Sequence, residues 1–306
     1  MHLLQSLTII FTIIGIGVFC GKRKIFSETH LEGFELFLFK VALPCYLFSA
    51  ILNNDFQNLV NIPYVLCYLS CFLCIAVIIT LCFFRHYDFS NICLKILAAS
   101  YVNTAIYALP IMIFLLDDPK AAVLSNLVQV IIIQSSFLTI LSLLKHREES
   151  LRKRLLKPLL TPLIVLPIIG MILCYCHITP HLIITTITKN LGDGVSSIAL
   201  FIFGLTLSNL HFKREDFNKT LCFLLFTKNI LHPVIAFILG KYLFHLDKYW
   251  FYAMIIAASS PTAFIVHVIS KQFTTNVRLT KMMVTISSGI ALVFLVGIAH
   301  LISILD

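Results

Sequence analysis

A run of polar residues and a proline interrupts one of the most apolar parts of this sequence. It reads Ser100-Tyr101-Val102-Asn103-Thr104-Ala105-Ile106-Tyr107-Ala108-Leu109-Pro110. A proline inside a helix removes one backbone hydrogen bond and clashes with the preceding turn. At membrane depth the freed backbone groups need other partners. The stretch therefore predicts a membrane helix that is broken at a polar site.

A second segment of this kind follows about half a chain later and reads Ser259-Ser260-Pro261-Thr262. Pro110 and Pro261 lie 151 residues apart, whereas the tripeptide Ala-Ala-Ser before each break repeats after 159 residues. The two markers therefore do not share one register. Broken helices in corresponding positions of two halves are the best sequence pointer to a carrier's binding site. The predicted substrate-binding residues are Asn103, Thr104, Pro110, Ser259, Ser260, Pro261 and Thr262.

The composition places the whole chain in a bilayer. Of 306 residues, 59% are hydrophobic and 12% are charged, against about 45–50% and 25% in a soluble domain. A membrane helix needs about 20 apolar residues, so ten spans with short loops use the entire chain. The expected spans are residues 2–20, 34–53, 62–84, 93–116, 121–144, 158–177, 182–209, 219–244, 250–270 and 280–304.

The positive charges predict the orientation of these spans. Seventeen lysines and arginines lie in the odd-numbered gaps between spans or in the first three residues of the span that follows, and only Lys120 and Lys248 lie in the even-numbered gaps. Because positive loops stay inside, we expect a multi-pass protein of the cell membrane with both termini outside and loop 145–157 in the cytoplasm. This loop divides the chain into repeats 1–144 and 158–306. Five spans per repeat force opposite orientations, so the expected fold is all-α, with ten transmembrane helices in a 5+5 inverted repeat.

Several functional classes are excluded. The net charge of +9 comes from loop residues, so it indicates topology and not nucleic-acid binding. Enzyme and nucleotide motifs such as HExxH, GxSxG and the P-loop are absent from the sequence, so we expect no enzyme and no cofactor. The cysteines lie mostly in apolar runs and indicate buried small side chains rather than a metal site or a disulfide framework.

Few ionisable residues lie inside the spans, and such residues are often functional. Lys40 is close enough to the inner end of its span to snorkel. Lys228 precedes His232-Pro233, a helix irregularity that favours a functional role. Asp193 suits a helix-entry residue or a cation site. These four residues, Lys40, Asp193, Lys228 and His232, are the candidates for charge or coupling roles.

Several segments, in order along nearly the whole chain, resemble the auxin efflux carrier family, which includes plant PIN-type carriers and bacterial malate and malonate permeases. The resemblance rests on Ala42-Leu43-Pro44, Asn103-Thr104 with Leu109-Pro110, Leu191-Gly192-Asp193, Lys228 with Pro233, and Pro261-Thr262-Ala263. Two departures are Lys40, where Asn is common in the family, and Ile265, where many bacterial members have Asn.

The resemblance implies that helices 4 and 9 cross at their prolines. Residues 1–60 and 158–210 would form a scaffold, and residues 61–144 and 219–306 a moving transport bundle. The family moves organic anions by an elevator-like motion, which implies a small carboxylate substrate held first by Asn103, with Gln134 lining the same site. A homodimer through the scaffold helices is left open, and the lipid bilayer is the other partner.

Two alternatives stay open. A sodium-coupled carrier of the bile-acid type shares the crossed-helix design, but it needs clustered sodium ligands, of which the sequence offers little beyond Asn103, Gln129 and Gln134. A membrane receptor without transport usually carries a soluble output domain, for which this chain has no room. The direction of transport and the coupling ion are open as well.

Overall fold

The computed structural model describes residues 2–53, 59–144, 160–208 and 217–305, and over these ranges the chain is helical. The first part holds α1 (His2–Lys22), α2 (Glu28–Phe37), η1 (Leu38–Ala42), α3 (Leu43–Leu52), α5 (Ile62–Phe83), α6 (Phe89–Ser100), η2 (Thr104–Ala108), α7 (Leu109–Leu116), α8 (Lys120–Val128), η3 (Gln129–Gln134) and α9 (Ser135–Leu144). The second part holds α11 (Pro162–Tyr175), α12 (Leu182–Gly192), α13 (Val195–Ser208), α14 (Lys219–Phe226), η5 (Thr227–Leu231), α15 (His232–Ile238), η6 (Leu239–Leu243), α16 (Lys248–Ser259), α17 (Phe264–Gln272) and α18 (Val277–Leu305).

Within the described residues, seven helical runs are long and apolar enough to cross a membrane. They are Leu4–Lys22, Thr29–Leu52, Ile62–Phe83, Lys120–Leu144, Leu182–Ser208, Lys219–Leu243 and Val277–His300. Three shorter apolar helices are Phe89–Ser100, Thr104–Leu116 and Pro162–Tyr175. The expected multi-pass membrane protein is confirmed, whereas the ten-span inverted repeat stays a prediction. The predicted cytoplasmic loop 145–157 lies outside the described residues.

Three intrahelical prolines sit just after wide π-turns. Pro44 follows η1, Pro110 follows η2 and Pro233 follows η5, each as the second residue of the next α-helix. The amide before the proline then bonds five residues back: Leu43 N–H donates to the Leu38 carbonyl, and His232 N–H to the Thr227 carbonyl. Proline has no backbone N–H to donate, and a π-turn accommodates this loss so that the helix continues past the proline.

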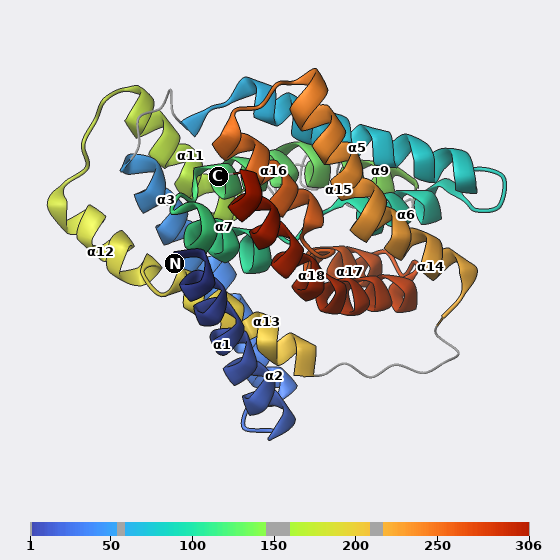
Figure 1. The fold of residues 1–306 in the computed structure, drawn as a ribbon, viewed down its shortest axis with the longest axis horizontal. Coiled ribbons are helices and arrows are strands. Elements are labelled where there is room, and N and C mark those ends of the chain that lie inside the picture. Colours follow the sequence, from blue (N-terminus) through green and yellow to red (C-terminus); the bar gives the residue numbers. More distant parts are fainter. Residues whose placement is uncertain (1, 54–58, 145–159, 209–216, 306) are drawn as a thin grey trace. The chain divides into compact units, whose positions relative to one another are not determined.

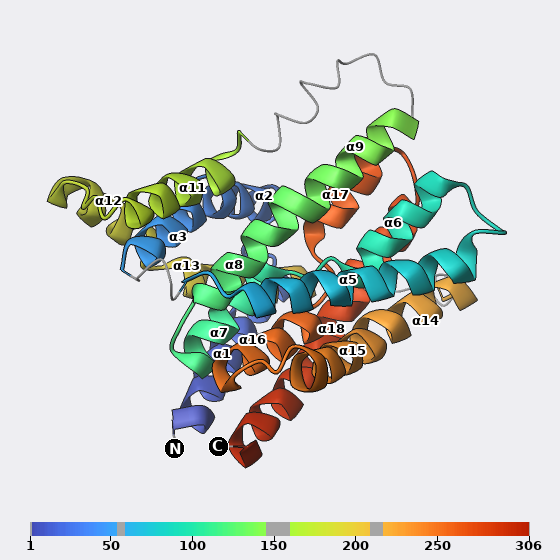
Figure 2. The same ribbon diagram turned by 90° about the horizontal axis from the view of Figure 1, so that it is seen from above.

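The chain divides into two compact units. Unit 1 comprises residues 1–61, 105–132 and 155–209. In it α1 packs along α13, and α3 packs against both α11 and α12 (Figures 1 and 2). Gly192, from the predicted Leu191-Gly192-Asp193 motif, lies so close to α3 that a Cβ there would be 2.7 Å from the Cα of Tyr46. The glycine of this motif therefore permits a close helix contact.

Unit 2 comprises residues 62–104, 133–154 and 210–306. Here α5 packs against α6, α15 and α16, and the long α18 packs against α14, α16 and α17 (Figure 2). Asp88, Asn218 and Asp247 cap the starts of α6, α14 and α16, each accepting a bond from the backbone amide three residues ahead. Such caps fix where each helix begins. The segments that follow the last residues of α6 and α16 hydrogen-bond to each other.

Candidate substrate site at the paired helix breaks

Two broken helices of unit 2 meet through their extended segments. After α6 ends at Ser100 and α16 ends at Ser259, Val102 and Thr262 form an isolated antiparallel bridge. The Asn103 amide donates to the Pro261 carbonyl at 2.8 Å, and the Ala263 amide donates to the Tyr101 carbonyl at 3.1 Å. Each break thus supplies the backbone partners that the other has lost, as buried irregular backbone requires.

The last carbonyls of both helices are also satisfied by side chains. The Thr262 hydroxyl donates to the Ala98 carbonyl of α6 at 2.7 Å. The Lys228 amine donates to the Ala258 carbonyl of α16 at 2.8 Å. Both acceptors lie in the last turn of their helix, where the carbonyls have no donor within the helix. The two bonds therefore supply the missing donors.

The two breaks lie at the same position relative to the Ala-Ala-Ser tripeptides, but not relative to the prolines. Ser100 and Ser259, the last residues of the tripeptides, are the last residues of α6 and α16. Pro261 lies in its break, but Pro110 lies beyond the other one, as the second residue of α7. The fourth helix therefore breaks at Tyr101–Asn103, where the backbone pairs with the Pro261 segment, and not at its proline.

Most of the predicted binding residues are buried around this pairing. Asn103, Thr104, Ser259, Ser260 and Thr262 are all buried. The hydroxyl of Ser260 donates to the Ile256 carbonyl. Gln134 is half-buried, and its side-chain oxygen accepts a bond of 2.8 Å from the hydroxyl of Tyr101. The Gln134 amide group therefore keeps its two N–H donors for another partner.

The candidate charged residues separate into two groups. Lys228 and His232 are buried in unit 2 and lie 3.4 Å apart, from Nζ to Nδ1. Lys40 and Asp193 are exposed residues of unit 1. Pro110 is likewise in unit 1. The structure thus places two of the four charged candidates, Lys228 and His232, beside the break of α16.

Comparison with known families identifies the chain at this point. The sequence pattern of the membrane transport protein family matches residues 2–299. The chain belongs to this family. The match confirms the resemblance to auxin efflux carriers and makes the protein a membrane transporter and not an enzyme. No curated protein matches the chain.

One contact of this transporter's break was not predicted from sequence. The Thr262 amide, which would continue the α16 ladder, donates instead to the hydroxyl of Ser287 on α18 at 3.0 Å. Ser287 and Ser288 form a hydroxyl pair inside an apolar span. Polar pairs of this kind mark helix contacts in membranes, so the pair was the available signal.

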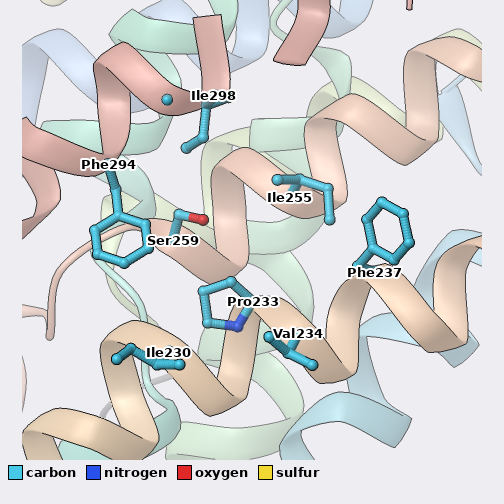
Figure 3. A pocket seen from close by; sticks show the side chains of 9 residues that line it. Ile230, Pro233, Val234, Phe237, Ile255, Ser259, Phe294 and Ile298 are labelled. Atoms are coloured by element: carbon cyan, nitrogen blue, oxygen red, sulfur yellow. The ribbon is translucent and has the colours of Figure 1, made fainter. Parts of the chain in front are cut away.

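A groove lies on one side of the α16 break in the transporter. It has a volume of about 280 Å³ and is walled by α15, α16 and α18. Figure 3 shows the Ser259 hydroxyl among apolar side chains, with Pro233 and Phe294 on either side of it. The remaining lining residues are apolar or glycine. The groove would therefore accommodate a hydrocarbon group rather than a charged group.

Replacing Thr262 by valine tests the pairing between the two breaks. Thr262→Val keeps the side-chain shape but leaves the Ala98 carbonyl without its donor, which costs about 1–3 kcal/mol when an acceptor is buried. We expect a lower free energy of unfolding, measured as a lower melting temperature in detergent. Thr285→Val on α18 is the control, because Thr285 is half-buried and its side chain makes no bond that the structure records. Equal shifts in both variants would contradict the pairing role.

Proposed function

We propose that this transporter is a carrier of small organic anions, with the carboxylate bound where α6 and α16 break. The observation that carries the proposal is the backbone pairing of Tyr101–Asn103 with Pro261–Ala263. It brings polar side chains and helix ends from two distant segments to one place. A site of this construction is typical of carriers with discontinuous helices.

The donors at the break favour an anion. The Asn103 side chain carries two N–H donors, and Gln134 keeps two that are not used by Tyr101. The N-cap residue of α17, which begins directly after the break, is Ala263, and this residue makes no side-chain cap bond. The first amides of a helix and its dipole attract negative charge. The hydroxyls of Thr262 and Ser260 already donate to backbone carbonyls. These two residues would therefore act by holding the backbone in place.

We further propose ten spans in two inverted repeats of five, with helices 4 and 9 crossing at the breaks. The charge pattern supports outside termini. The two compact units support an elevator-type motion, since such a motion needs two bodies. Residues 105–132 group with unit 1, although the family resemblance implies that they belong to the transport bundle. The moving body would then hold α5, α6, α9 and α14–α18.

The two other readings have less support. Family membership disfavours a receptor without transport, because the matched family consists of transporters. A sodium-coupled carrier of the bile-acid type would place a cation at the carbonyl end of a broken helix. In this chain the amine of Lys228 donates to that carbonyl.

Uptake into proteoliposomes tests the function. The panel is labelled acetate, benzoate, malonate, malate and succinate, and benzoate is included because the groove beside Ser259 is apolar. We expect at least one acid to accumulate above the level in protein-free liposomes, with competition by the same unlabelled acid. The proposal fails if none of the acids is taken up and none raises the melting temperature of the purified protein.

A further inference from the structure

Lys228 is a basic residue enclosed by protein. Its side chain is fully buried in η5, with the amine 2.8 Å from the Ala258 carbonyl and 3.4 Å from the Nδ1 of His232. Among the residues that the structure describes, no carboxylate pairs with it. An ammonium without a partner is costly to bury, so these two acceptors must compensate its charge.

The helix end of α16 provides this compensation. In an unbroken helix the Ala258 carbonyl would accept from the amide four residues on, that of Thr262. That amide donates to Ser287 instead, because the chain turns away at Pro261. The carbonyl end of a helix also carries a partial negative charge. A positive group is therefore favoured at this point, and the Lys228 amine is the group that lies there.

Broken-helix carbonyls of this kind are the ligands that cation-coupled carriers offer to Na⁺. An ammonium and a sodium ion have the same charge, and both are attracted to carbonyl oxygens. The ammonium of Lys228 differs in being attached to α14–η5–α15 by its own side chain. His232 completes its environment, since Nδ1 must be the acceptor when the lysine is the donor.

We infer that Lys228 is a built-in cation that holds the α16 break in shape, so that this carrier needs no free monovalent cation at that position. The inference rests on the proposed function, because the break it holds is the proposed anion site. Lys228 is on this view a positioning residue, which acts on the anion through the backbone of Ala258–Thr262. It also disfavours the sodium-coupled alternative.

The first test measures uptake of the five labelled acids with sodium or with choline as the only external cation. We expect wild-type rates to differ by less than about twofold between the two salts. Lys228→Met removes the charge and the donor and should lower uptake by about tenfold or more, as loss of a buried charged hydrogen bond does. Lys228→Arg should retain part of the rate. Lys241→Met is the matched control, since Lys241 lies exposed on the same helical run, and it should transport normally.

The second test separates a bound cation from simple packing, and it needs no transport. Lys228→Ala removes the atoms of propylammonium, which can be added back. We expect propylammonium to raise the melting temperature of this variant saturably, and to restore part of its uptake. Choline, a cation without N–H donors, should do neither, and the wild type should respond to neither salt.

Three results would overturn the inference: sodium-dependent uptake in the wild type, normal uptake by Lys228→Met, or a Lys228→Ala variant whose melting temperature ignores propylammonium. If the wild type moves none of the five acids and none of them raises its melting temperature, the proposed function fails. The melting experiment then still decides whether Lys228 acts as the cation of this site.

Discussion

Gly17→Leu will prevent α1 from packing on α13. A Cβ on Gly17 would lie 2.4 Å from the backbone oxygen of Phe201, and one on Gly204 would lie 2.2 Å from that of Ile14. Backbone atoms cannot move aside as a flexible side chain can. The two helices must separate, and we expect a loss of about 3 kcal/mol or more, at or beyond the upper end for overpacked sites. Thermal unfolding in detergent, followed by size-exclusion chromatography, measures this loss.

The control variant is Gly15→Leu on the same helix. Gly15 is exposed, and no atom outside its own helix lies within 4 Å of the Cβ it would gain. This variant should match or slightly exceed the wild-type melting temperature, because glycine weakens a helix by about 0.5–1 kcal/mol relative to alanine. If both variants lose the same stability, the effect belongs to glycine replacement in general and the close contact is not its cause.

The spacing behind this contact is present in the sequence, although the contact was not predicted from it. Gly17 and Gly21 form a GxxxG pair on α1, and Gly204 and Ser208 form a GxxxS pair on α13. Small residues at this spacing let membrane helices approach closely. What the sequence does not contain is the partner of each pair, because nothing local links residue 17 to residue 204. Spans are local properties and were predictable, whereas their packing is not.

The break in the fourth helix shows the same division. The stretch Ser100–Pro110 was predicted to hold a helix broken at a polar site, and the helix does break within it, at Tyr101–Asn103. Pro110 was predicted to mark the crossing, yet the π-turn Thr104–Ala108 accommodates that proline within helix. The position of the break is decided by pairing with Pro261, more than 150 residues away. The position of Pro110 therefore did not mark the break. The repeated Ala-Ala-Ser tripeptide lies directly before it.

Lys40 and Lys228 illustrate why the surroundings of a residue were harder to predict than the apolar helical runs. Each lies in a π-turn, four or five residues before a proline, in an otherwise apolar helix. Lys40 is nevertheless exposed and Lys228 fully buried. The difference comes from the helix end of α16, whose Ala258 carbonyl accepts from Lys228. The role of a lysine in such a helix thus depends on a contact with a helix that is distant in the sequence.

Asn103→Ala will abolish or greatly reduce uptake of the transported acid while leaving the fold intact. The backbone amide of Asn103, which donates to Pro261, is unchanged by the substitution. Only the side-chain amide is lost, and a hydrogen bond to a charged group contributes about 1.5–3 kcal/mol. We therefore expect uptake to fall roughly ten- to a hundredfold, since about 1.4 kcal/mol corresponds to a factor of ten. Initial rates in proteoliposomes, at substrate concentrations below half-saturation, measure the change.

Two further variants show whether the lost group is a donor to an anion. Asn103→Asp keeps the size but replaces the donors by a negative charge, so it should transport no better than Asn103→Ala and bind the acid more weakly. Asn91→Ala changes the same residue type near the start of α6, far from the break, and should transport at the wild-type rate. Uptake by Asn103→Asp above that of Asn103→Ala would mean that position 103 faces a cation or a proton donor. Wild-type uptake by Asn103→Ala would remove the side chain of this residue from the site.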